Sequence, residues 1–272
     1  MANKATPKKF AMQQVFELLL RKPSDKSIVA YLTDVKTSGL DNTVEMVYPV
    51  GGQGNVYIGG GFAHSRRATF NVSTATWNID VMALQNGTEV QRDTSEVTYY
   101  DLIQADGTGT LKTTFTALGA TGTEIGFVYK LNDDGTHEKE FIQDAETAAS
   151  GKFTYATATK TFTFDTSERP IAGDYYECAY TYRPSGSERI TVEANAIPSV
   201  ALVTAFGIAR DICNSELYPA QVEGQVQIDG NWSFDLSADG DPAVQNLNME
   251  FVKGCLESKL YNFTVFTEEE GE

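Results

Sequence analysis

The sequence has few of the residues on which metal sites and disulfide frameworks depend. Its 272 residues include three cysteines and two histidines. Cys178, Cys213 and Cys255 are odd in number, widely spaced and form no CxxC pair, which argues against a disulfide framework or a thiolate metal site. His64 and His137 form no HExxH motif, so the pattern also disfavours a histidine metal site. We expect the cysteines to be core thiols.

Long apolar runs are absent as well. No stretch approaches the length of about 18 apolar residues that a membrane helix needs, and the N-terminal MANKATPKKF lacks the apolar centre of a secretion signal. We therefore expect no membrane association and folding in a cytoplasm. The four Asn-x-Ser/Thr sequons, at Asn71, Asn86, Asn231 and Asn262, are then expected to carry no glycan.

Nucleotide-binding motifs are missing despite one glycine-rich stretch. Six of the fifteen positions from Gly51 to Ser65 are glycine, directly before the pair Arg66 and Arg67. Reading from Gly52 gives GQGNVY, with tyrosine in the place of the third fingerprint glycine, and no Gly-Lys-Ser/Thr follows for a Walker loop. Repeated glycine in a β protein marks positive φ, bulges or close approach of another chain. We interpret the stretch as a loop that contacts other subunits.

The sequence motifs of common catalytic sites are also absent or incomplete. There is no GxSxG, and a Ser-His-Asp arrangement would depend on His64, which we interpret as a surface or turn residue. DLSADGDP, with Asp235, Asp239 and Asp241, resembles part of a calcium loop but misses the EF-hand positions and the closing glutamate. Nothing selects a glycosidase pair among the 37 acids. We assign no catalytic, cofactor-binding or metal residues and expect no enzyme.

What the chain has in excess is negative charge, with a formal net charge of −16. The first 26 residues are basic, with six Lys or Arg against two acids, whereas residues 211–272 carry thirteen acids against Lys253 and Lys259. Such a surface repels polyanions, which limits tight nucleic-acid binding to the N-terminal segment. Solubility alone is the alternative explanation.

Helix signals are few. In QQVFELLLRK, residues 13–22, Val15, Leu18 and Leu19 follow helical spacing before Pro23, although a strand results if tertiary pairing overrides it.

A second helix is predicted in the segment 71–87. Ser73 or Thr74 would cap it, Trp77, Val81 and Leu84 would share a face, and Gly87 would end it.

Elsewhere the pattern predicts strands and turns, because β-branched and aromatic residues alternate with polar ones. The fold class is therefore mainly β, a sandwich or barrel with one or two short helices. The expected strand segments are 27–36, 43–50, 68–73, 125–131, 152–165, 175–183, 189–196, 201–212, 224–238 and 260–266.

Composition changes near residue 88, where a polar, threonine-rich series of short strands begins. We predict that residues 88–187 are a β-rich insertion of immunoglobulin-like proportions, between core segments 1–87 and 188–272. Alternatively, these strands extend the main sheets.

Several segments follow one another in a recognisable order. They are VYPVGGQGN (47–55), SRRATFNVS (65–73), WNIDVMALQNGTEV (77–90), GKFTY, KTFTF and YYECAYTY (within 151–182), ANAIPSVALVTAFGIARD (194–211) and VQIDGNWSFDLSADGDPAVQNLNMEFVKG (226–254). In this order they resemble the tail tube (major tail) proteins of tailed bacteriophages. Many of those proteins have a strand ending in a Gly-Gly-x-Gly-Asn loop, then a charged pair and a strand, and later a Pro-containing strand, an Arg-Asp pair and an Asp-Pro boundary. The sequence departs from them at NVYIGGG, where relatives usually have proline and a basic residue.

The resemblance implies a β-sandwich with a flanking helix, six copies of which form a ring whose sheets join into an inner β-barrel. Stacked rings would build the tube through which the genome leaves the virion, with contacts through the loop Gly51–Arg67 and the N-terminal arm. Other expected partners are the tape-measure protein, tail-terminator or baseplate proteins, and DNA in transit. The location would be the virion tail, after assembly in the bacterial host cytoplasm.

Three further expectations follow from the tail-tube interpretation. Residues 88–187 would decorate the tube exterior. Some of the acids in residues 211–272 would line the channel, where like charge keeps DNA from sticking. No cofactor is expected.

Two other classes remain open. One is another virion component, such as a capsid or decoration protein. The other is a carbohydrate-binding β-sandwich or hydrolase, for which Tyr175, Tyr176, Tyr180 and Tyr182 are the only hint. Alternating strand tyrosines more often pack across strands.

Overall fold

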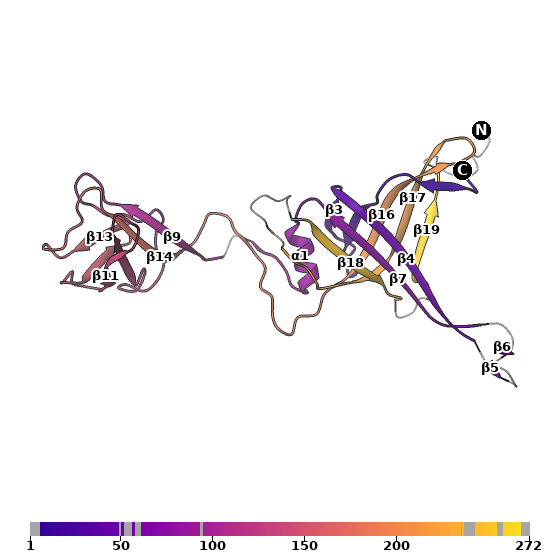
Figure 1. The fold of residues 1–272 in the computed structure, drawn as a ribbon, viewed down its shortest axis with the longest axis horizontal. Helices are drawn as coiled ribbons and strands as arrows, with labels where there is room; N and C mark the ends of the chain where they lie inside the picture. Colours follow the sequence, from indigo (N-terminus) through magenta and orange to yellow (C-terminus); the bar gives the residue numbers. More distant parts are fainter. Residues whose placement is uncertain are drawn as a thin grey trace. The chain divides into compact units, whose positions relative to one another are not determined.

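The chain is mainly β, as predicted, and divides into two compact units (Figure 1). The computed structural model describes residues 6–48, 50–51, 56–57, 61–92, 95–234, 236, 243–254 and 258–267. Unit 1 combines residues 1–90 and 190–272, and unit 2 is residues 91–189.

Unit 1 is built on one nine-stranded sheet. Its order is β3-β2-β16-β17-β18-β7-β4, with β1 added to β16 and β19 added to β17. The first and last strands of this order are separated by only two residues in the chain, so the sheet curls back toward its own beginning. The strands are β1 (Phe10–Met12), β2 (Glu17–Arg21), β3 (Ile28–Leu32), β4 (Val35–Val47), β7 (Phe62–Thr74), β16 (Val200–Asp211), β17 (Leu217–Ile228), β18 (Gln245–Phe251) and β19 (Tyr261–Val265).

One face of this sheet encloses the core of unit 1. Side chains alternate along each strand, so Leu18 and Leu20 of β2, Phe70 of β7 and Val222 of β17 all lie inside with no exposed surface. Because the sheet is curled, its strands supply opposite walls of the same core.

The helix predicted over residues 13–22 is wrong. Residues 17–21 form β2, which pairs with β3 on one side and β16 on the other. The two neighbouring strands form hydrogen bonds with the backbone of β2. Side chains of a strand alternate between its two faces, so Leu18 and Leu20 are buried while Leu19 lies on the other face. Tertiary pairing thus overrides the helical spacing.

The second predicted helix exists but begins later. Helix α1 spans Ile79–Asn86, and Asn78, not Ser73 or Thr74, caps it by accepting hydrogen bonds from the backbone N–H groups of residues 80 and 81. Ser73 and Thr74 belong to β7. Gly87 ends the helix in the left-handed conformation with φ 63°, as predicted. The helix packs Val81 and Leu84 against the core.

Unit 2 contains a six-stranded sheet in the order β13-β12-β11-β10-β14-β9. β11 and β12 run parallel, and the other neighbours are antiparallel. Its separate core is rich in aromatic rings, including Phe141, Phe153 and Tyr176. The strands are β9 (Val97–Gln104), β10 (Phe127–Leu131), β11 (His137–Gln143), β12 (Lys152–Ala156), β13 (Thr161–Phe164) and β14 (Tyr175–Tyr182).

The chain enters and leaves unit 2 through a short paired ladder. β8 (Gln91–Arg92) pairs antiparallel with β15 (Glu188–Arg189). Arg92 Nε donates to Glu188 Oε1 at 2.9 Å, and the Ser95 N–H donates to Ser187 Oγ at 3.1 Å. The two connections therefore run side by side.

Several strand predictions need correction. Residues 190–196 form no strand, and β17 ends at Ile228, so the described residues 229–234 and 236 are not strand either. β9, β11, β18 and the first half of β17 were not expected. The long β4 also begins earlier than predicted, at Val35.

Candidate assembly surfaces

Uncharged amides line the part of the unit 1 sheet that β17, β18 and β7 form, on the face opposite the core. Along β17, buried Ala220, Val222 and Val226 alternate with partly exposed glutamines, and β18 alternates buried Leu247 and Met249 with exposed asparagines. The pairing places these side chains in adjoining rows, since Asn248 lies opposite Asn71. We call this surface the amide face: Asn71, Gln221, Gln225, Gln227, Asn246 and Asn248.

Charged groups lie beside the amides, and β2 adds Glu17 and Arg21 to the same side of the sheet, where the Arg21 guanidinium donates to Thr204 Oγ1 at 3.0 Å. The Arg67 guanidinium donates to both Glu250 carboxylate oxygens, at 2.8 and 2.7 Å, and Glu250 in turn raises the pKa of Arg67. Glu223 accepts hydrogen bonds from Gln221 Nε2 at 3.3 Å and Asn262 Nδ2 at 3.0 Å. The acids of the predicted calcium-like turn, Asp235, Asp239 and Asp241, lie outside the described residues.

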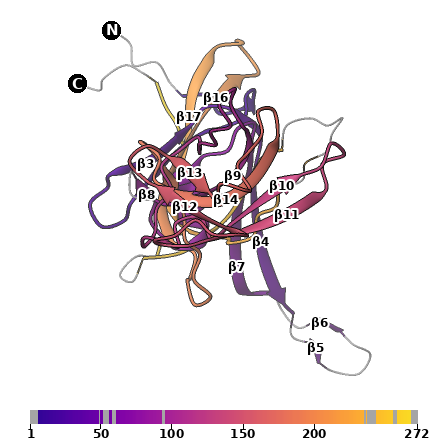
Figure 2. The ribbon, with the colours of Figure 1, turned by 90° about the vertical axis from the view of Figure 1, so that its left-hand side faces the viewer.

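The predicted contact loop Gly51–Arg67 is largely the end of a long hairpin. β4 and β7 pair from Val35 opposite Thr74 to Val47 opposite Phe62, and run together toward β5 (Val50–Gly51) and β6 (Val56–Tyr57) (Figure 2). Arg66 and Arg67 therefore lie in a strand, because cross-strand pairing extends past them, and not in a loop. Gly52–Asn55 and Ile58–Gly60 lie outside the described residues.

Gly61 leaves room for two side chains of this hairpin. A β-carbon there would come within 2.6 Å of the Tyr48 ring and 3.0 Å of the Met46 methyl group. These neighbours belong to the same hairpin, so the expected close approach of another chain stays a prediction.

His64 is an exposed strand residue. Its Nδ1 atom lies 3.8 Å from Glu45 Oε2, and the Ser65 hydroxyl donates to that same carboxylate at 3.0 Å. Because Ser65 bonds to the acid and not to the histidine, the three groups do not form the nucleophile-base-acid order of a triad.

The N-terminal arm is anchored in the sheet from Lys9 onward. The carbonyl of Lys9 accepts the Ile212 N–H at 3.3 Å, β1 pairs with the end of β16, and the Phe10 ring stacks on Phe263 at 5.9 Å. Residues 1–5 lie outside the described chain. The segment left for contacts with other copies is therefore shorter than expected.

Four strands of the unit 1 sheet have an unpaired edge. Among the strands that the structure describes, β1, β3, β4 and β19 each pair with one neighbour only. The β4 edge is thirteen residues long, more than twice the usual strand length of about 5–6 residues.

The four tyrosines of β14 do not form a common surface. Tyr176 and Tyr180 are buried, Tyr182 is half-buried and Tyr175 is exposed. Alternation along the strand explains the division, as expected for cross-strand packing.

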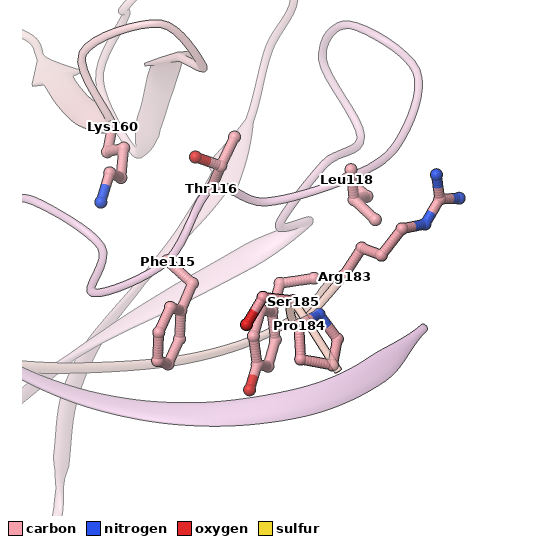
Figure 3. A pocket seen from close by; sticks show the side chains of 8 residues that line it. Phe115, Thr116, Leu118, Lys160, Arg183, Pro184 and Ser185 are labelled. Atoms are coloured by element: carbon pink, nitrogen blue, oxygen red, sulfur yellow. The ribbon is translucent and has the colours of Figure 1, made fainter. Parts of the chain in front are cut away.

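A shallow pocket lies at the end of β14 in unit 2 (Figure 3). The Phe115 and Tyr182 rings stack there at 4.3 Å, beside Lys160 and Arg183. Lys160 Nζ already donates to the Thr114 carbonyl at 3.0 Å, and Arg183 pairs with Glu96 at 2.7 Å. The residues that line the pocket include no carboxylate, so it offers no acid pair for glycoside hydrolysis.

The described parts of the chain show neither a metal-binding cluster nor a membrane-length helix. No group of three or more His, Cys, Asp or Glu side chains is placed to hold a metal ion there. No described helix is long and apolar enough to cross a membrane.

Comparison with known proteins identifies the family. A search of curated proteins found no match. The model of the YomU/Tube protein family matches residues 10–261, which include most of each part of unit 1 and the whole of unit 2. This match confirms the resemblance carried by the ordered sequence segments. The chain therefore belongs to the YomU/Tube protein family and is a structural tail tube protein of the phage virion.

Proposed function

We propose that copies of this protein join edge to edge into rings, that the rings stack into the tail tube, and that the genome passes along the amide face. The observation that carries the proposal is the unpaired, thirteen-residue edge of β4. Its unpaired N–H and C=O groups are a template for a strand of another copy. As expected from the family resemblance, six copies close each ring.

Ring closure requires that two different edges meet. If β4 paired with β4 of a second copy, the contact would be a closed twofold dimer, whereas pairing with a different edge generates a ring or a filament. β3, β1 and β19 supply other edges on the same sheet. Joining edges in this way also removes the aggregation hazard of a long exposed strand.

The amide face suits a surface along which DNA slides. Tight binding to DNA depends on cations that neutralise phosphates, and Arg67 on this face is already paired with Glu250. The net charge of −16 opposes adhesion further. We propose a channel whose lining along the amide face is mainly neutral, with Glu223 and Glu250 among its acids.

The remaining parts of the proposal concern partners. Unit 2, which overlaps the predicted insertion 88–187 over residues 91–187, decorates the tube exterior. The hairpin end and the N-terminal segment contact the next ring. The tape-measure protein and tail-terminator or baseplate proteins complete the tail in the host cytoplasm.

Two adjacent proline substitutions test the edge contact. Backbone groups alternate in direction along an antiparallel strand, so one of Asn42 and Thr43 points its N–H toward β7 and the other toward the unpaired edge. We expect one of Asn42→Pro and Thr43→Pro to lower thermal stability strongly. The other should fold with a smaller loss yet form no rings or tubes in negative-stain microscopy.

Wild-type protein is the reference for both variants. A persistent wild-type monomer, or shells and trimers in place of rings, contradicts the tube proposal. Tubes formed by the stably folded proline variant would instead exclude β4 as the contact.

A deletion tests the position of unit 2. Joining Arg92 to Glu188 through a short glycine turn removes the unit while keeping the β8–β15 ladder. We expect intact rings with a smaller outer diameter, and loss of assembly would contradict an exterior position.

A further inference from the structure

One face of the unit 2 sheet is open and rich in aromatic side chains. Along β9, β14, β10 and β11, alternate residues enter the core, and the residues between them form the opposite face. Exposure there reaches 60% for Tyr100 and 48% for Phe127. We call this face the aromatic platform: Tyr100, Leu102, Phe127, Tyr129, Ile142 and Tyr175.

The strand register makes the platform continuous. Phe127 lies opposite Ile142 across β10 and β11, and Tyr129 lies opposite Glu177 across β10 and β14. Glu177 lies opposite Leu102 across β14 and β9. Glu177 is therefore at the centre of the platform, with apolar side chains on both sides.

Hydrogen bonds fix the central rings. Glu177 accepts a hydrogen bond from the Tyr100 hydroxyl at 2.5 Å and contacts His137 Nε2 through its other oxygen. The His137 ring stacks on Tyr129 with centroids 4.4 Å apart and planes 15° apart. One carboxylate of β14 thus holds Tyr100 of β9 and His137 of β11, and His137 holds the Tyr129 ring of β10 by stacking. Because these groups are ordered before a ligand binds, binding loses less conformational entropy.

This combination matches the surface of a sugar. A pyranose ring has C–H faces that pack on aromatic rings and an edge of hydroxyl groups that donate and accept hydrogen bonds. The platform offers flat rings and, among them, the Glu177 carboxylate as acceptor and the His137 ring as a further polar partner.

Other ligand classes fit the centre of the platform less well. Protein interfaces are depleted of charge at their core, and an apolar partner would cover the Glu177 carboxylate without offering it a further hydrogen-bond donor. A polyanion would meet the carboxylates of Glu140 and Glu177. We infer that the aromatic platform binds neutral saccharides.

The experiment uses the purified full-length protein on a printed array of neutral and of polyanionic oligosaccharides. We expect binding to neutral glycans, confirmed by titration of the best neutral oligosaccharide. Tyr100→Ala, which removes a ring, and Glu177→Gln, which keeps the shape but removes the charge, should each weaken binding at least tenfold. Ile171→Ala is the matched control, because Ile171 is 68% exposed in unit 2 but belongs to none of its strands.

Circular dichroism and thermal melting check that each variant is folded, and Phe127→Ala replaces Tyr100→Ala if the latter fails. Absence of binding to every neutral glycan overturns the inference, as does binding to polyanionic glycans alone. An altered sedimentation coefficient in Tyr100→Ala with unchanged glycan binding would assign the platform to contacts between copies and would equally overturn it. None of these outcomes depends on whether tubes form.

Discussion

The carbonyl oxygen of Ile197 lies against the α-carbon of Gly87, so closely that a β-carbon on residue 87 would come within 1.9 Å of it. The Ser199 N–H donates to the Leu84 carbonyl at 2.9 Å in the same place. The end of α1 and the segment that returns from unit 2 are therefore packed backbone against backbone. Since Gly87 also has φ 63°, two independent constraints select glycine.

Gly87→Ala should destabilise unit 1. The left-handed conformation alone costs a residue with a β-carbon about 1–2 kcal/mol, and the clash with Ile197 adds to it. Thermal unfolding measures the loss. Gly107→Ala is the control, because nothing lies within 4 Å of a β-carbon there. Equal melting temperatures for the two variants would contradict the packing described.

Tyr180→Phe should destabilise unit 2 by about 1–3 kcal/mol, the cost of leaving buried polar groups without a partner. The Tyr180 hydroxyl donates to buried Asp101 at 2.8 Å and accepts the Phe115 N–H at 2.9 Å. Chemical denaturation measures the change. Tyr175→Phe, at an exposed position of the same strand, should have little effect, and a comparable loss there would show that the buried hydrogen bonds are not responsible.

Alkylation of the folded protein should distinguish Cys178 from Cys213. Burial raises the pKa of Cys178 to about 12, with Asp101 and Glu177 adding to the rise, whereas Cys213 is exposed. At pH 8 we expect iodoacetamide to modify Cys213 and to leave Cys178 unmodified until the protein is denatured. Peptide mass spectrometry reads both sites, and rapid labelling of Cys178 would show that the unit 2 core opens readily. Cys255 lies outside the described residues.

Unit 2 should lose stability in acid as Glu168 is protonated. The Lys139 ammonium, the Gly151 N–H and the Ser150 hydroxyl donate to this carboxylate and lower its pKa from 4.5 to about 2. A lowered folded-state pKa stabilises the fold above the unfolded value, and this contribution is lost as pH falls from about 4.5 toward about 2. Calorimetric melting temperatures between pH 6 and pH 2 measure the loss.

Glu168→Gln is the matched variant for this titration. It should melt lower than the wild type at pH 6 and depend less on pH below 4.5. Some dependence will persist, because Lys152 and two backbone N–H groups similarly lower the pKa of Asp144. A variant with the unaltered wild-type pH profile would contradict the role of Glu168.

The sequence predicts the class of the fold better than its individual strands. Gly87 alone predicts where helix α1 ends, because a helix end that needs positive φ selects glycine. β18, QNLNMEF, escapes detection because its outward residues are asparagines, which have low strand propensity, although Leu247 and Met249 alternate correctly into the core. β2 is misread because three consecutive leucines fit both periods, and only pairing with two neighbours decides between them.

The composition of the amide face and of the aromatic platform depends on the register in which the strands pair, and the sequence does not reveal that register. Tyr175 and Tyr180 look alike in the sequence, yet one is exposed and the other is buried. Glu177 and His137 meet across strands 40 residues apart, and no local pattern marks that contact. Arg67 reads as part of a loop until its pairing with Thr43 is known. The exterior position of residues 88–187 stays a prediction.

The paired strands β8 and β15 would allow another domain to replace unit 2. The chain would be joined to the new domain after Arg92 and before Glu188, and the pairing of Gln91 with Arg189 and of Arg92 with Glu188 holds these two positions one strand spacing apart, about 5 Å. Any foreign domain whose own termini lie that close can therefore be fused between them without stretching unit 1. In the proposed tube each subunit would then carry one copy of the guest, and the protein would serve as a scaffold for displaying enzymes or antigens at regular intervals.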